Sequence, residues 1–211
     1  MGLREEKKRR TRTLLSDTAT ALFAEHGFER VTVADVARAA GVAVNTVFNY
    51  FPTKEDLFFD RQEEVVARLA LVVRERPADA SPVDAVRAEL LAGLDADEPT
   101  YGLNPHAAAF WRTIEASSAL RVRLLELGER AEEALAEALA EEAGTAPGDP
   151  LPRLVAGALA GAHRAALAEV RRGVVAGEPV DAVRDRVVAA ATAAFGLLTA
   201  GLADWPAGRG R

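Results

Sequence analysis

Apolar residues in the N-terminal part of the chain recur with the period of an α-helix, and glycines separate the segments. A first helix is predicted over residues 10–26, and Gly27 ends it. Its apolar residues share one face: Leu15, Ala19, Leu22 and Phe23. Thr32 begins a second helix, because Asp35 three residues later completes a capping box, and Gly41 ends that helix. The pattern therefore indicates short helices joined by tight turns.

A third short helix is predicted to run to about Tyr50. Thr53 and Asp56 then form a second capping-box pattern, which predicts one long helix from Thr53 to about Arg76, where Pro77 stops it. Because one end would lie near the third helix and the other deep in the rest of the chain, we expect this long helix to transmit motion as a rigid element.

The remainder of the chain repeats the helical period in longer segments. Loops separate five further predicted helices, at residues 82–96, 106–116, 119–143, 153–173 and 180–203. No stretch shows the period of two that a strand requires. We therefore predict an all-α fold of about nine helices.

Composition narrows the possible functions. With 49% hydrophobic and 27% charged residues among 211, the chain has ordinary globular usage. It has no cysteine, which excludes disulfides, thiolate catalysis and cysteine-ligated metals. The three histidines, His26, His106 and His163, are scattered, so we expect no metal and no other cofactor. No apolar run is as long as a membrane span, and we expect a soluble, cytoplasmic protein without membrane contact.

Charge is distributed unevenly along the chain. Residues 1–54 carry nine basic and six acidic residues, whereas residues 55–211 carry 17 basic and 26 acidic. Six basic residues lie within the first twelve positions: Arg4, Lys7, Lys8, Arg9, Arg10 and Arg12. Such a basic front end predicts contact with a polyanion there, although a basic run by itself is also typical of a solvated tail.

The second and third predicted helices have the layout of a helix-turn-helix, in which the second helix enters the major groove of DNA. Gly41 provides the tight turn, and Ala37 is the small residue where the two helices cross. Their shared core would consist of Val36, Val42 and Val47. Helical hairpins with glycine turns also occur in other bundles, but here a basic segment precedes the pair.

Residues 22–58, LFAEHGFERVTVADVARAAGVAVNTVFNYFPTKEDLF, resemble the DNA-binding domain of the TetR family of bacterial transcriptional regulators. The resemblance implies an N-terminal three-helix DNA-binding domain followed by a larger helical domain for ligand binding and dimerisation. We accordingly expect a basic arm at residues 1–9, the DNA-binding domain at 10–56, the second domain at 57–205 and a flexible tail at 206–211.

The resemblance and the side-chain chemistry together predict the DNA-contacting residues. They are Arg9, Arg10, Arg12, Thr32, Val33, Ala43, Val44, Asn45, Thr46, Phe48, Asn49, Tyr50 and Lys54. Asn45 and Asn49 have amides suited to adenine, and Thr46 suits a thymine methyl group or a phosphate. By resemblance, Lys54, Thr32 and Tyr50 are placed on phosphates. Tyr50 is equally suited to packing inside the domain.

Three positions depart from the family pattern. Ala43 stands where a serine is usual, so the third helix lacks a side-chain N-cap. Phe48 replaces a frequent tyrosine and has no hydroxyl for a phosphate. Val44 replaces a polar residue, so base reading at that position is apolar.

The last two helices are expected to form the dimer interface, because small residues allow close helix approach and two-fold symmetry strengthens operator binding. The predicted interface residues are Ala158, Ala162, Val187, Ala191, Ala194 and Leu198. The alternative is that these residues fill the core of a single chain.

A ligand cavity is expected among the middle helices, framed by residues 58–142. Its candidate lining residues are Phe59, Leu69, Tyr101, His106, Phe110, Trp111, Arg112, Glu115 and His163. Each of these residues is also compatible with an ordinary core or interface position.

The resulting hypothesis is a homodimeric repressor that binds a palindromic operator in double-stranded DNA and is released by a small apolar or amphipathic effector. The alternatives are a regulator that responds to a protein partner or to no ligand, and an enzyme with an accessory DNA-binding domain. The sequence contains no phosphate-binding glycine loop, nucleophile elbow or zincin motif, so we expect no enzymatic activity.

Overall fold

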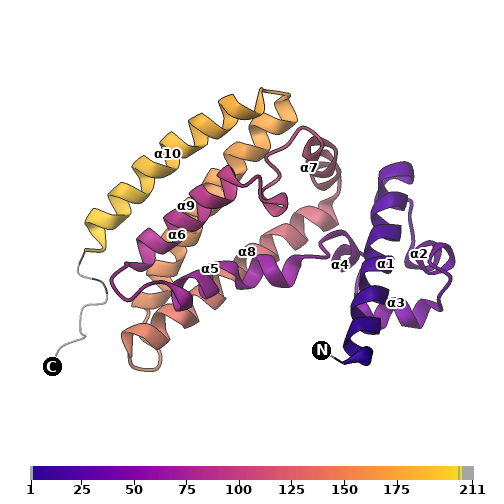
Figure 1. Ribbon diagram of the computed structural model, residues 1–211, viewed down its shortest axis with the longest axis horizontal. Helices are drawn as coiled ribbons and strands as arrows, with labels where there is room; N and C mark the ends of the chain where they lie inside the picture. The colour runs from indigo at the N-terminus through magenta and orange to yellow at the C-terminus, as the bar shows by residue number, and fades with distance from the viewer. Residues whose placement is uncertain (1, 204, 206–211) are drawn as a thin grey trace. The chain divides into compact units, whose positions relative to one another are not determined.

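The computed structural model describes residues 2–203 and residue 205. Within these residues the chain is all-helical, with ten α-helices, one short 3₁₀-helix and no strand, which confirms the predicted fold class (Figure 1). The flexible tail predicted at residues 206–211 lies outside the described residues. No helix in the described part of the chain is long and apolar enough to cross a membrane.

The chain forms two compact units. The first contains the residues up to Gln62 together with Arg112–Arg123, and the second contains Glu63–Trp111 and the residues from Leu124 onward. The chain therefore leaves the first unit, returns to it at the junction of two helices and leaves it again. The expected boundary at residue 56 did not include this return.

Four helices build most of the first unit: α1 (Leu3–His26), α2 (Val33–Ala39), α3 (Val44–Tyr50) and α4 (Lys54–Phe58). They pack around a continuous apolar core, because each helix buries the face predicted from its period. The core residues are Leu15, Ala19, Phe23, Phe28, Val36, Ala37, Val47, Phe51 and Leu57. Phe28 packs against Phe23 after the turn at Gly27, with ring centroids 5.1 Å apart.

Two expectations for this region are wrong. The basic arm is not separate from the domain, because α1 begins at Leu3 and continues through it. The long helix predicted from Thr53 to Arg76 is two helices, α4 and α5 (Gln62–Glu75). The break occurs because α1 holds the intervening turn: Arg12 donates to the carbonyl of Asp60 at 2.8 Å, and the Ser16 hydroxyl donates to the Asp60 carboxylate.

The second unit contains α5, α6 (Pro82–Asp95), the 3₁₀-helix η1 (Pro99–Tyr101), α9 (Leu151–Ala176) and α10 (Val180–Gly201). α6, α9 and α10 lie side by side (Figure 1). Two helices are shared between the units: α7 (Ala107–Ala116) and α8 (Ser118–Ala143). The interior of the second unit is lined mainly by leucine and valine, with Leu90, Leu94, Leu139, Leu159 and Phe195 completely buried.

Candidate functional site

The α2–α3 pair has the geometry of a helix-turn-helix. Thr32 caps α2 in a reciprocal capping box with Asp35, as the sequence predicts. Hydrogen bonds from Thr32 lower the pKa of the Asp35 carboxyl below its ordinary value. Gly41 has a positive φ of 68° at the turn, where a side chain would be strained. Val47 is completely buried and fixes which side of α3 faces outward.

The outward side of α3 combines amide and apolar side chains. Asn45 and Asn49 are exposed, and Thr46 is half-buried beside them. Val44 and Phe48 are also exposed, by 38% and 46%, although both are apolar. Exposed apolar side chains beside amides suit the edges of bases, where thymine presents a methyl group and adenine a donor and an acceptor.

The start of α3 lacks a side-chain cap, as its sequence predicts. Ala43 occupies the N-cap position with extended backbone angles, and no side chain hydrogen-bonds to the free amides there. At the start of α2, by contrast, the Thr32 hydroxyl accepts from the Asp35 amide and donates to its carboxylate at 2.6 Å. Thr32 therefore uses its hydroxyl proton within the cap, and Val33 beside it is half-buried.

Two residues predicted to contact DNA phosphates, Arg12 and Lys54, form bonds inside the domain. Arg12 donates to the carbonyls of Tyr50 and Asp60, and its guanidinium lies 4.3 Å from the centroid of the Phe51 ring. Lys54 donates to the carbonyl of Phe28 at 2.9 Å and lies over the ring of the same residue. These cations therefore join α1, α3 and α4, and their contact with DNA phosphates stays a prediction. Sequence alone did not reveal this because the partners are 26 to 48 positions away.

The exposed basic residues lie earlier on α1. Arg4, Lys7, Lys8, Arg9 and Arg10 are all exposed. Arg9 and Arg10 remain predicted phosphate contacts, presented from a helix rather than from a flexible arm. Tyr50 is half-buried, consistent with either of its predicted roles.

A buried carboxylate joins α4 to the junction of α7 and α8. Asp56 caps α4 with Thr53 and also accepts from Gln62 at 3.0 Å and from Arg123 at 2.6 Å. Burial by itself would raise the pKa of the Asp56 carboxyl, but the hydrogen bonds from Gln62 and Thr53 and the charge of Arg123 outweigh it and lower the pKa. Near the same junction, Ser117 donates to Glu29 at 2.5 Å. The sequence revealed the cap but neither Gln62 nor Arg123 as its partner.

The structure does not bring the nine predicted ligand-lining residues together. Leu69, Tyr101, Trp111 and His163 are buried in the second unit. His106 and Phe110 are exposed. Phe59, Arg112 and Glu115 belong to the first unit. Four of the nine are therefore buried together in one unit, and ligand contact by any of them stays a prediction.

A polar cluster lies inside the second unit around two of those members. Tyr101 donates its hydroxyl proton to Glu89 at 2.5 Å and lies 3.1 Å from Nε2 of His163. Arg68 donates to the other oxygen of Glu89 at 3.3 Å and to Thr100 at 2.9 Å. The partial burial of Arg68 and Glu89 was not predicted from the sequence, because charged residues on amphipathic helices are normally exposed.

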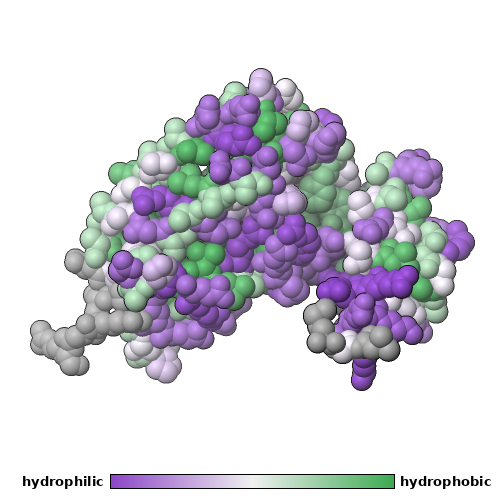
Figure 2. Space-filling model, in the orientation of Figure 1, coloured by the Kyte–Doolittle hydropathy of each residue, from purple (hydrophilic) through white to green (hydrophobic). Residues whose placement is uncertain are grey.

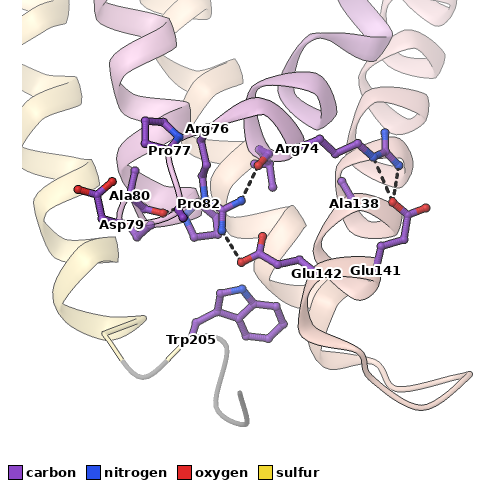
Figure 3. Close-up of a pocket in the computed structure, with 13 residues that line it drawn as sticks. Arg74, Arg76, Pro77, Asp79, Ala80, Pro82, Ala138, Glu141, Glu142 and Trp205 are labelled. Carbon is purple, nitrogen blue, oxygen red and sulfur yellow. Dashed lines mark hydrogen bonds and ion pairs between the residues drawn. The ribbon is translucent and has the colours of Figure 1, made fainter. Parts of the chain in front are cut away.

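One pocket of about 610 Å³ opens at a different place in the second unit (Figure 3). It lies between the end of α5, the loop after it, the C-terminal part of α8 and Trp205. None of the predicted ligand-lining residues borders it. Asp79 also borders it, and its other charged groups are paired within the chain: Arg74 with Glu141 at 3.0 Å, and Arg76 with Glu142. The pocket therefore presents no uncompensated charge from these pairs.

The predicted dimer interface is partly buried in the chain itself. Val187 and Ala191 are 1% and 4% exposed and pack inside the second unit, so we correct their assignment. Ala158 and Ala194 are exposed, while Ala162 and Leu198 are half-buried. On the same two helices Leu154 and Leu197 are exposed by 67% and 77%. Figure 2 shows apolar residues following α10 along the edge of this unit.

Comparisons with known proteins agree with this organisation. A model of the bacterial regulatory proteins of the TetR family matches residues 15–60, and a model of the MftR C-terminal domain matches residues 80–177. MftR of Mycobacterium tuberculosis, named for regulating mycofactocin biosynthesis, is 39% identical over 84 residues, which is 40% of this chain and 42% of that protein. The transcriptional regulator TcmR of Streptomyces glaucescens is 30% identical over 146 residues, which is 68% of this chain and 65% of TcmR. The chain thus matches less than two thirds of the length of both relatives.

Solved structures share the fold. SmeT in complex with triclosan has a TM-score of 0.55 and 18% sequence identity, with 91% of each chain covered. SmeT is the repressor of the multidrug efflux pump SmeDEF of Stenotrophomonas maltophilia. At this identity the similarity establishes a common fold for the two chains.

Proposed function

We propose that this chain, which belongs to the TetR family of transcriptional regulators, is a repressor that binds a palindromic operator as a homodimer and is released by a small molecule bound in its second unit. Members of the family regulate transcription and are not enzymes. The exposed side of α3, with Asn45 and Asn49 beside the exposed Val44 and Phe48, is the observation that carries the proposal.

DNA reading by α3 is tested by selecting binding sites from a random pool of duplexes. We expect Asn49→Ala to change the selected sequence, because one bidentate amide contact discriminates between bases by about 1–3 kcal/mol. Thr20→Ala, an exposed substitution on α1, is the control and should select the wild-type sequence. An unchanged consensus for Asn49→Ala would contradict base reading by α3.

The exposed arginines of α1 should act on every duplex equally. Replacing Arg9 and Arg10 by alanine should reduce the slope of log affinity against log salt by about 0.9 for each phosphate that the protein no longer neutralises. The matched control replaces Arg153 and Arg172, two exposed arginines of α9, and should leave the slope unchanged. Equal slopes for both double variants would remove α1 from the interface.

Dimer formation is supported by the apolar strip of α9 and α10. Leu154 and Leu197 are large apolar residues that a single chain leaves in water, which is typical of an association surface. We expect Leu197→Glu to produce monomers in sedimentation velocity, and Leu125→Glu, at an equally exposed leucine of α8, to leave the dimer intact. Identical sedimentation of both variants would place the interface elsewhere.

Release by a small molecule is supported at the level of the fold, since SmeT shares it and has been solved with triclosan. In this chain the buried polar cluster around Glu89 offers specific hydrogen-bonding groups in the second unit. Charged and polar groups converging in an apolar interior are typical of ligand sites.

A further inference from the structure

Tyr101 occupies the interior of the second unit although it lies in a connection between helices. The connection from α6 to α7 turns inward, so that Tyr101 and Leu103 are each only 2% exposed. Connecting segments normally run over the surface. Two left-handed residues shape this path: Gly102 at φ 68° and Asp97 at φ 51°, the latter held by Arg184 at 2.5 Å.

The Tyr101 ring lies in a seat that fits an aromatic ring. On one side is Gly93 of α6, where a Cβ would lie 2.9 Å from Cζ of the ring, so only glycine leaves room for it. The Arg68 guanidinium lies 5.2 Å from the ring centroid, a cation–π distance. The His163 ring meets the tyrosine ring edge to face, with centroids 5.7 Å apart.

The far end of this seat recognises a hydroxyl group. The Tyr101 hydroxyl donates to Glu89 at 2.5 Å, and Nε2 of His163 lies 3.1 Å from the hydroxyl oxygen and 3.4 Å from the same Glu89 oxygen. Because the hydroxyl proton goes to Glu89, a proton on Nε2 faces two acceptors, the hydroxyl oxygen and the carboxylate oxygen. Burial would raise the pKa of Glu89, but hydrogen bonds from His163 and Tyr101 and the charges of His163 and Arg68 outweigh it and lower the pKa. The ionised carboxylate therefore accepts the hydroxyl proton and would repel an anion at that position, while the imidazole N–H faces an acceptor. A phenol supplies both at one atom.

Trp111, which lies next to this connection, has a hydrogen-bond donor without an acceptor in the described part of the chain. Nε1 of Trp111 is buried and has no hydrogen-bond partner among the described residues. It faces Gly102, where a Cβ would lie 2.7 Å from it. A buried indole N–H without a partner costs free energy, so the described part of the chain leaves one donor unsatisfied beside Gly102.

From these observations we propose that the seat of Tyr101 is the effector site and that it binds small neutral phenols. The Tyr101 side chain fills the site when no phenol is bound, and so competes with the phenol. The proposal rests on the ligand release described under Proposed function. A phenol enters when the connection withdraws, donates to Glu89 and accepts from His163. Because the open state is a minor one, the apparent affinity is reduced by the fraction of open molecules.

The test uses 4-methylphenol, the side-chain analogue of tyrosine, titrated into the full-length protein by calorimetry. We expect binding to the wild type and at least about tenfold weaker binding of 4-methylanisole, which cannot donate to Glu89. Ionised 2,4-dinitrophenol should not bind, because Glu89 would repel it. Absence of 4-methylphenol binding at millimolar concentration, or equal binding of the anisole, overturns the proposal.

Variants test whether phenol binding depends on the polar groups of this site or only on an empty cavity. Tyr101→Ala should bind 4-methylphenol about tenfold or more tightly than the wild type, because the competitor is removed. Glu89→Gln should reduce the preference for phenol over anisole. Phe195→Ala opens a cavity at another completely buried aromatic residue of the same unit and should show no such preference. If Tyr101→Ala does not fold, Tyr101→Phe is used in its place. The phenylalanine variant loses both hydrogen bonds of the hydroxyl group but keeps the ring.

Two further measurements separate phenol binding at this site from release of operator DNA, which belongs to the proposed function. In a Trp205→Phe background Trp111 is the single tryptophan, and its fluorescence should change when 4-methylphenol displaces the connection. Operator affinity is measured in parallel by gel shift. Selective phenol binding without any change in operator affinity upholds the site and contradicts ligand release, whereas release that persists unchanged in Glu89→Gln contradicts the site.

Discussion

Asp56 and Glu89 are both ionised, largely buried carboxylates, one in each unit, and both accept hydrogen bonds from an arginine and from neutral groups. They differ in how far along the chain their partners lie. Asp56 caps its own helix through Thr53, three positions away, and only Arg123 is distant. Glu89 is bound by Arg68, Tyr101 and His163, all on other elements.

This difference shows which interactions position the carboxylate in each unit: largely local ones for Asp56, and long-range ones for Glu89. In the first unit a local motif fixes the carboxylate, and the distant arginine then attaches the α7–α8 junction to it. In the second unit the partners of Glu89 come from other elements, and the cluster forms only when α5, α6, η1 and α9 pack together. A local motif survives small movements of its neighbours, whereas a cluster built from four elements depends on their arrangement.

The largest effect is expected from breaking the non-local cluster. Glu89→Ala leaves the Arg68 charge and the Tyr101 hydroxyl with fewer partners in the interior, and should lower the free energy of unfolding by about 3–5 kcal/mol. Glu64, a more exposed partner of Arg68, is the control, and Glu64→Ala should cost less than about 1 kcal/mol. Urea unfolding measures both. Equal losses of unfolding free energy in the two variants would show that the largely buried Arg68 charge does not depend on Glu89 as its partner.

An intermediate effect is expected from pH. Both carboxyls have a pKa below their ordinary values of 3.8 and 4.5, so each stabilises the folded protein above those values. That stability is lost as pH falls through the lower folded pKa. Asp56→Asn and Glu89→Gln should each reduce the acid slope of the unfolding free energy by up to about 1.4 kcal/mol per pH unit. Denaturant unfolding between pH 6 and about 3 measures the slopes; unchanged slopes in both variants would exclude these groups.

The smallest effect is expected from adding a local motif where the chain lacks one. Ala43 occupies the N-cap of α3 without a side-chain hydrogen bond, so Ala43→Ser should raise the free energy of unfolding by about 1 kcal/mol. Thr32→Ala removes the cap of α2 and should lower it by a similar amount. Thermal unfolding of the two variants gives shifts of opposite sign. A shift in the same direction for both would contradict capping as their common cause.

The local parts of the fold follow from the sequence. The helix-turn-helix was predicted from Thr32, Asp35 and Gly41, because caps and turns depend on residues a few positions apart. The exposed side of α3 followed from its period. The division of the α4–α5 segment did not, since the capping box at Thr53 predicts only where a helix starts, and α1 decides through Arg12 where it stops.

The sequence alone was enough to predict an all-helical fold, a helix-turn-helix that follows the basic N-terminal segment, and the side chains that α3 presents. Periodicity and capping are local, so they operate before the chain has packed. Only the tertiary structure decided that Arg12 and Lys54 hold the first unit together, that Val187 and Ala191 are core, and that Arg68, Glu89, Tyr101 and His163 meet. These outcomes depend on contacts between distant elements: buried charges need partners in the low-dielectric interior, and apolar residues are buried only where another helix covers them.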